Sequence, residues 1–197
     1  SMARRSFRTP CAGSRPRQMS YAPRRLTVLL NDETKDVADG NYKHCFVVNK
    51  LDHYIYTVMV KGQLVRIKPN TRTCELLLKK VGTSTRPDAC DSYLAFSPVK
   101  GQENMLYVAM AEGNQIWRVD VGNLEGKDKN TYPGEGYAGK AILEGQVAGA
   151  GWEDGLLRNA KFDNPHQICF TEDGKLYIAD CGNNCIRVID TKLPLDR

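Results

Sequence analysis

Three segments of the chain share one pattern of apolar and polar positions. Each is a pair of short apolar runs, rich in β-branched and aromatic residues, separated by a turn that contains glycine. The pairs occupy residues 53–71, 104–123 and 174–191. Two such runs around a glycine turn are typical of a β-hairpin. The sequence therefore predicts three hairpins, with the glycine and asparagine residues of their turns supplying positive φ angles.

The three hairpins also match one another residue by residue. The first run of each is centred on a tyrosine, namely Tyr56, Tyr107 and Tyr177. The second run of each holds an arginine, namely Arg66, Arg118 and Arg187. Because the shape of the segment recurs, we interpret it as a structural repeat.

The repeat extends beyond the hairpins. A further apolar run precedes each pair, at residues 44–48, 93–96 and 166–170, and the runs 74–78 and 141–145 follow the first two pairs. Four short strands per unit, repeated every 40–50 residues or so, are typical of a β-propeller. The tyrosines are spaced by 51 and 70 residues, so we expect a surface-loop insertion over residues 122–139, which are rich in glycine and charge.

No segment has the apolar periodicity of a helix of three turns, so the sequence predicts an all-β fold. We expect an incomplete β-propeller of about three four-stranded blades over residues 39–197. The blades are expected at about residues 40–80, 81–145 and 146–197, in the order of the hairpins. Residues 1–38 are expected to form a flexible basic leader with a possible stray strand.

The net charge of +5 is concentrated in that leader. Residues 1–31 hold seven of the 28 basic residues and none of the 23 acidic ones, so the rest of the chain is close to neutral. The leader is either an arm that binds a polyanion or a poorly packed segment. A near-neutral folded part argues against nucleic acid as the partner. No apolar run approaches the roughly 20 residues that cross a bilayer, so no membrane span is expected.

Seven cysteines are present, an odd number, and none form the paired C-x-x-C spacing of a zinc site. We expect mostly buried free thiols, with Cys45 and Cys169 acting as small apolar side chains within strands. Cys181 and Cys185 flank a turn, where a bridge between the two strands is an open alternative.

Residues 151–190 resemble the NHL repeat. Phe162 and Pro165 precede the first strand, Asp173 and Gly174 form a turn, and the strands 176–180 and 182–187 follow. The second hairpin keeps much of this pattern but has Met110 at the position of Asp180. The resemblance implies an NHL-type propeller of about six blades. The chain would then be a fragment, which we favour, or a half-propeller completed by a second copy in a homodimer.

The lead-in around Trp152 and the segment 87–96 are similar to bacterial surface-associated NHL-repeat proteins, which often carry an IPT/TIG domain before the propeller. Residues 1–38 are too few for such a domain. The resemblance implies a non-catalytic binding or scaffold module at the cell surface or in the periplasm, with a carbohydrate or protein as ligand. Two alternatives are a hydrolase or lyase, lactonase-like and assisted by a divalent metal in the central channel, and an RNA-binding propeller.

Candidate ligand-binding residues come from two arguments. His44, Asp91 and His166 precede the first strands of their units, so they are expected near the channel mouth, where a histidine could hold a ligand or only bond the blade backbone. Trp152 and Tyr137, together with Tyr132, lie in glycine-rich segments and could stack on a sugar ring. Trp117 is expected between blades. Asp180 is expected to bond the amides of its turn.

The sequence contains no recognisable set of catalytic or metal-binding residues. It contains no nucleotide-binding or hydrolase motif, and no acidic cluster with metal-ligand spacing accompanies the histidines. We therefore assign no catalytic residue, no metal ligand and no cofactor.

Overall fold

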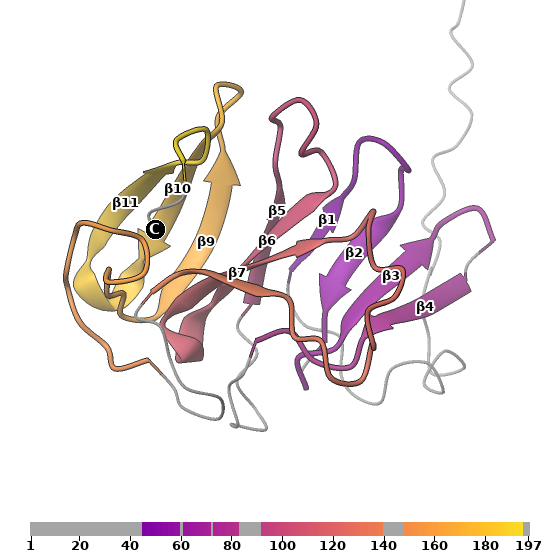
Figure 1. Cartoon of the computed structure of the whole chain (residues 1–197), viewed down its shortest axis with the longest axis horizontal. Helices are drawn as coiled ribbons and strands as arrows, with labels where there is room; N and C mark the ends of the chain where they lie inside the picture. The colour runs from indigo at the N-terminus through magenta and orange to yellow at the C-terminus, as the bar shows by residue number, and fades with distance from the viewer. Residues whose placement is uncertain (1–44, 60, 72, 83–91, 140–147, 195–197) are drawn as a thin grey trace, which may run out of the picture.

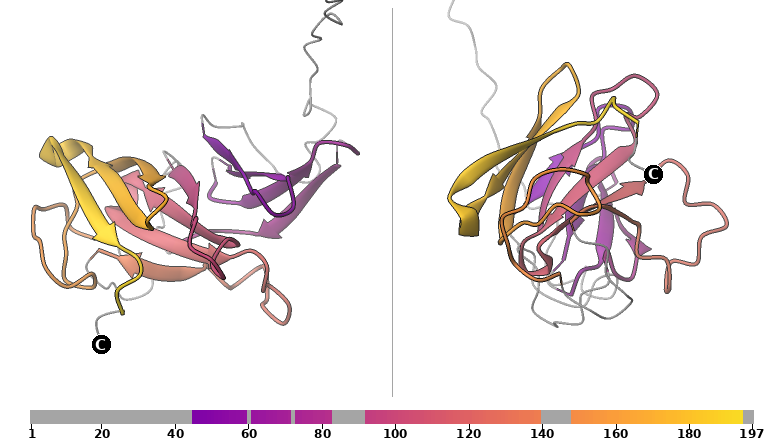
Figure 2. Two further views of the ribbon diagram at one scale, coloured as in Figure 1. Left: turned by 90° about the horizontal axis from the view of Figure 1, so that it is seen from above. Right: turned by 60° about the vertical axis from the view of Figure 1, so that its left-hand side comes forward.

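The computed structural model describes residues 45–59, 61–71, 73–82, 92–139 and 148–194. Their strands form three antiparallel sheets that follow one another side by side across the molecule (Figures 1 and 2). Each sheet corresponds to one predicted blade. The all-β prediction is therefore confirmed, and the sheets are called blades 1, 2 and 3 in chain order.

The strands of each blade are adjacent in sequence order. Blade 1 contains β1 (Phe46–Val48), β2 (Ile55–Val58), β3 (Leu64–Lys68) and β4 (Thr73–Leu78). Blade 2 contains β5 (Ser92–Phe96), β6 (Met105–Met110), β7 (Gln115–Asp120) and β8 (Glu135–Ala138). Blade 3 contains β9 (Pro165–Phe170), β10 (Lys175–Asp180) and β11 (Cys185–Asp190). Two short 3-10 turns, η2 (Ala111–Gly113) and η3 (Cys181–Asn183), join the hairpin strands of blades 2 and 3.

The outer strand of blade 2 differs from the prediction. The strand β8 lies inside the segment expected to be a surface loop, whereas residues 140–147, which include the expected strand 141–145, lie outside the described residues. Arg118 pairs with Glu135 across the two strands, and their side chains form an ion pair of 3.0 Å. The sequence of β8, Glu-Gly-Tyr-Ala, has no run of apolar residues, so backbone pairing and this ion pair define the strand rather than a hydrophobic pattern.

The remainder of the insertion, residues 122–134, contacts both blade 1 and blade 2. The amide of Lys79 donates to the carbonyl of Lys129 (2.7 Å), and the amide of Gly82 donates to that of Pro133 (2.9 Å). The side chains of Leu124 and Tyr132 pack on the core between blades 1 and 2. The long connection therefore stabilises the contact between these blades.

Two apolar cores lie between the blades. The first joins Tyr56 and Leu64 of blade 1 to the face of blade 2 that holds Val108 and Trp117. The second joins the opposite face of blade 2, with Tyr107, to Ile178 of blade 3. Since both faces of blade 2 are buried, its strand β6 is almost entirely apolar, as expected for a sheet packed on two sides. The prediction that Trp117 lies between blades is confirmed.

The repeated tyrosines and arginines are only partly equivalent. Tyr56 is opposite Arg66 and Tyr107 is opposite Arg118, but Tyr177 is opposite Val188. Arg187 is opposite Ile178 and thus lies on the other face of its blade. Because neighbouring residues of a strand point to opposite faces, a shift of one residue moves the side chain across the sheet. Arg187 therefore occupies the position of Trp117, which is opposite Val108.

The turn glycines also act differently from the prediction. Gly62 has a φ of 82°, but at the turns of blades 2 and 3 the left-handed residues are Asn114 and Asn184, each with a φ of 53°. Gly182 is required for another reason. A Cβ atom there would overlap the carboxylate of Asp163, and the amide of Gly182 donates to the carbonyl of Asp163 (2.8 Å).

The cysteines of the described residues are free thiols, so the bridge between Cys181 and Cys185 does not form. The prediction of burial is wrong for Cys169 and Cys181, which are exposed. Cys45 and Cys74 are partly buried, and burial raises the pKa of both thiols. Across the described ranges, no helix has the length and apolarity to cross a membrane.

Candidate functional site

The segment that leads into β9, residues 148–164, crosses from blade 2 to blade 3 and is called the strap. Its two limbs are joined to each other. The amide of Gly151 donates to the carbonyl of Phe162 (3.0 Å), Glu153 bridges to Lys161, and the side chains of that pair form an ion pair of 2.7 Å. The strap is thus held as a closed loop rather than an open connection.

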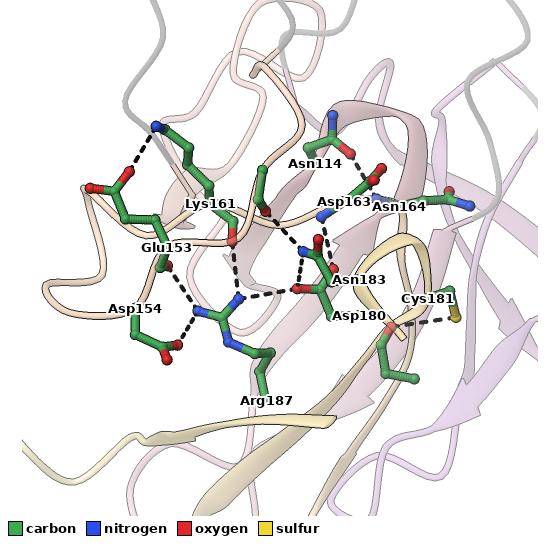
Figure 3. Close-up of polar contacts among 12 residues, drawn as sticks. Asn114, Glu153, Asp154, Lys161, Asp163, Asn164, Asp180, Cys181, Asn183 and Arg187 are labelled. Carbon is green, nitrogen blue, oxygen red and sulfur yellow. Dashed lines mark hydrogen bonds and ion pairs between the residues drawn. The ribbon is translucent and has the colours of Figure 1, made fainter. Parts of the chain in front are cut away.

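Arg187 fastens the strap to blade 3 (Figure 3). Its Nη1 donates to the carbonyl of Lys161 (3.0 Å), and its Nη2 donates to the carbonyl of Glu153 (2.9 Å). It also pairs with the carboxylate of Asp154, and its guanidinium lies 5.1 Å from the ring centroid of Phe162. One side chain therefore contacts both limbs of the strap.

Asp180 joins the hydrogen-bond network between Arg187 and the strap. It is fully buried, and its Oδ2 accepts from Nη1 of Arg187 (3.1 Å) and from Nδ2 of Asn183 (2.9 Å). Its Oδ1 accepts from the amide of Asp163 (2.8 Å). The prediction that Asp180 bonds the amides of its turn holds for the side-chain amide of Asn183, and the carboxylate also reaches the backbone amide of Asp163 in the strap. Asn183 in turn donates to the carbonyl of Gly151 (2.8 Å).

Trp152 follows this anchored glycine directly. Its side chain is 71% exposed, although the residues on both sides of it are fixed by Asn183 and Arg187. The prediction of an exposed ring at Trp152 is confirmed. A large aromatic ring on a fixed backbone loses little conformational entropy when it binds a ligand, so it is suited to stacking against one.

A hollow of about 600 Å³ adjoins the strap where it meets the turn of blade 2. It is lined by Ala111, Glu112, Asn114, Ala148, Gly149, Ala150, Asp163 and Asn164. Asn114 connects the two sides, because its Nδ2 donates to the carbonyl of Ala148 (2.9 Å) and its Oδ1 accepts from the amide of Asn164 (2.8 Å). The hollow thus combines polar side chains with a strap that carries Trp152 two residues beyond Ala150.

The structure describes one of the three residues predicted at the channel mouth. His166 is half-buried at the start of β9, and its ring stacks on Tyr93 of β5 with centroids 5.2 Å apart. His44 and Asp91 lie outside the described residues. The contact between His166 and Tyr93 joins the first strands of blades 2 and 3, while a ligand role for the three residues stays a prediction.

Tyr137 does not present a free ring. It is 6% exposed, packs edge-to-face on Tyr107 with centroids 4.9 Å apart, and has the guanidinium of Arg118 5.2 Å from its ring centroid. Burial, followed by the neighbouring Tyr107, raises its pKa. The expectation of an exposed sugar platform at Tyr137 is corrected, because β8 places the ring in the core. Tyr132 is partly buried, with the ammonium of Lys127 4.9 Å from its ring centroid.

A second hollow, which the sequence did not indicate, lies where the first strands of the three blades end. Its volume is about 350 Å³, and its apolar walls include Val48, Phe96 and Phe170, one from each blade. Lys50 and Glu172 also line it. The carboxyl ends of β1, β5 and β9 form this hollow, whereas His166 lies near the amino end of β9. The hollow could not be predicted from the sequence, because its walls come from three blades that are far apart along the chain.

Within the described part of the chain, no group of three or more His, Cys, Asp or Glu side chains could hold a metal ion.

Comparison with known proteins gives a family match and a fold match. The NHL repeat family matches residues 162–189, which span the end of the strap and the strands of blade 3 up to Ile189. No curated protein matches the chain.

Among solved structures, an auxiliary nutrient binding protein from Bacteroides thetaiotaomicron is 18% identical, with a TM-score of 0.56 over 75% of this chain and 33% of that one. An auxiliary nutrient binding protein from Bacteroides ovatus is 19% identical, with a TM-score of 0.53 over 75% of this chain and 33% of that one. A protein of unknown function from Bacteroides thetaiotaomicron is 20% identical, with a TM-score of 0.54 over 74% and 32%. The chain therefore spans about a third of the length of these structures.

Proposed function

From the premise that the chain is an NHL-repeat protein forming part of a β-propeller, we propose that it is a non-catalytic binding module that holds a carbohydrate against Trp152. The observation that carries the proposal is the 71% exposure of Trp152 on a strap fixed by Arg187, Asp180 and Asn183. Exposed aromatic rings are favoured where a ligand has one apolar face and polar edges, as a sugar ring has.

The hollow beside the strap supports the same ligand class. Glu112, Asp163 and Asn164 place carboxylate and amide groups along it, and such groups can bond the hydroxyls of a sugar. The hollow at the ends of β1, β5 and β9 has walls that are more apolar, although Lys50 and Glu172 also line it. We therefore favour the strap side of the molecule as the binding surface.

Two further features of the proposal rest on resemblance. Two of the similar Bacteroides structures are auxiliary nutrient binding proteins, which agrees with a binding role. A location at the cell surface or in the periplasm would give such a module access to extracellular glycans. Since fold alone does not determine function, binding has to be measured on this chain.

Calorimetric titration with a panel of neutral and acidic oligosaccharides tests the proposal. We expect saturable heat with at least one oligosaccharide, and Trp152→Ala should weaken that binding at least about tenfold, equivalent to about 1.4 kcal/mol. Trp152→Phe should retain part of the affinity because it keeps an aromatic face.

Leu156→Ala is the matched control, since Leu156 is an exposed apolar residue on the same strap (52%). It should leave the affinity unchanged. Flat titrations with every oligosaccharide would exclude the glycan role, and heat with an unglycosylated protein in their place would show that the ligand is a polypeptide.

A further inference from the structure

A repeated position brings three apolar side chains together at the carboxyl ends of the first strands. Val48, Phe96 and Phe170 are the last residues of β1, β5 and β9, and all three line the hollow of about 350 Å³. The strand β5 lies between the other two and contacts both. The hollow is therefore centred on blade 2, with a wall from the neighbouring blade on each side.

The two aromatic rings in the hollow are held in place by buried tyrosines of the preceding blades. Phe96 packs edge-to-face on Tyr56 with ring centroids 5.1 Å apart, and Phe170 packs in the same way on Tyr107, also at 5.1 Å. The tyrosines are 0% and 1% exposed, whereas the phenylalanines are half-buried and line the hollow. Rings that are already fixed can bind an apolar side chain with little loss of conformational entropy.

The position two residues beyond each strand end places opposite charges on the two sides of the hollow. It holds Lys50 after β1, Pro98 after β5 and Glu172 after β9, and each of these residues lines the hollow. Lys50 and Glu172 are exposed, and among the described residues neither makes an ion pair. The carboxylate of Glu103, which also lines the hollow, accepts from the amide of Gly101 (2.7 Å). The hollow thus has a free cation on one side, a free anion on the other and an apolar floor between them.

We propose that this hollow binds a short apolar peptide by both of its ends, with the terminal ammonium at Glu172 and the terminal carboxylate at Lys50. A fatty acid would leave Glu172 without a partner, and a single amino acid carries both charges on one carbon. A peptide of three residues spans about 10 Å, so its ends can meet opposite sides while its middle side chain lies on the aromatic floor. The volume of about 350 Å³ is typical of a site for a small ligand.

This peptide site is separate from the carbohydrate site proposed at Trp152. The strap leads into the amino end of β9, whereas the hollow lies at the carboxyl end of the same strand (Figure 1). The two sites should therefore bind independently of each other, and the peptide proposal does not rest on the carbohydrate proposal.

Calorimetric titration with the tripeptide Ala-Phe-Ala and its end-blocked forms tests the proposal. The peptide with both ends free should bind saturably. Acetylation of its amino end or amidation of its carboxyl end should each weaken binding about three- to fivefold, because each removes one charge at an exposed pair. The tripeptide Ala-Ala-Ala should bind at least about tenfold more weakly, because it has no ring to bury.

Two variants assign each end of the peptide to its side of the hollow. Lys50→Gln should bind the free and the amidated peptide equally, and Glu172→Gln should bind the free and the acetylated peptide equally. Lys100→Gln, at an exposed lysine that does not line the hollow, is the matched control and should bind all four peptides as the unaltered chain does. Trp152→Ala should also leave peptide binding unchanged.

Four results would each overturn the proposal. They are a flat titration with the free peptide, equal affinity for the free and the doubly blocked peptide, and a variant that still distinguishes the end assigned to it. The fourth is loss of peptide binding in Trp152→Ala, which would place the peptide on the strap.

Discussion

Arg187 shows how one residue position can change its role between repeats. In blade 2 the positions of Asp180 and Arg187 hold Met110 and Trp117, which pack in the core with blade 1. In blade 3 they hold a buried ion pair whose arginine also binds two backbone carbonyls of the strap. The third repeat therefore uses this face both to pack on blade 2 and to fix the strap that carries Trp152.

Replacement of Arg187 should therefore be costly. Arg187→Met leaves the carboxylate of Asp180 buried without its cation, and breaking a buried pair costs about 3–5 kcal/mol. Urea unfolding should show a loss of that size. Arg158→Met, at an exposed arginine of the same strap, should cost less than about 0.5 kcal/mol.

The double variant Asp180→Asn with Arg187→Met supplies the internal check. An asparagine at position 180 can still accept from the amide of Asp163 but carries no charge. The double variant should be more stable than Arg187→Met alone. Equal stability of the two would mean that the charge of Asp180 is not what makes the substitution costly.

At the scale of the element, the hairpin of β10 and β11 is held by its turn. The amide of Gly182 donates a hydrogen bond to the carbonyl of Asp163 in the strap. The two segments can lie this close because Gly182 has no side chain. The left-handed residue of the turn is Asn184 rather than the glycine. The glycine of this repeat is thus explained by contact between segments far apart in the sequence.

Substitution at this glycine tests that explanation. Gly182→Ala should destabilise the protein by about 1–3 kcal/mol, because the added methyl group must displace the carboxylate of Asp163. Gly149→Ala is the control, since a Cβ there meets no atom within 4 Å. Thermal unfolding of both variants measures the difference, and an equal effect at the two positions would contradict the explanation.

The elements also show which parts of the fold local patterns can predict. The hairpins and the strands β1, β4, β5 and β9 coincide with runs of apolar residues, which are visible in the sequence alone. The strand β8 does not, because half of it is exposed and its pairing rests on backbone bonds and on Glu135. The sequence does not predict on which face of blade 3 Arg187 lies, because a register shift of one residue leaves no local signal in the sequence.

The candidate site was predictable to the same extent. An exposed ring at Trp152 follows from its glycine-rich surroundings. The fixing of the strap by Asp180, Asn183 and Arg187 does not, because these contacts join residues up to 34 positions apart. The burial of Tyr137 depends on β8 and could not be predicted without that strand.

At the scale of the molecule, three blades and two cores give a rigid support for a polar surface. The core between blades 2 and 3 includes Phe162 of the strap, so the strap is part of the interface between blades. Hydrogen bonds of the Asn114 side-chain amide connect the strap to the turn of blade 2. A ligand held by the strap would therefore bind a surface already fixed in its bound conformation, with little ordering required.

Nuclear magnetic resonance of the two tryptophan indole N–H groups tests the binding account most directly. Trp117 is 8% exposed and Trp152 is 71% exposed, so the chain carries one buried reference and one reporter. On titration with an oligosaccharide that gives heat in calorimetry, we expect the Trp152 signal to shift saturably while the Trp117 signal stays in place. A saturable titration in which the Trp152 signal does not move would contradict the assignment of the strap as the binding site.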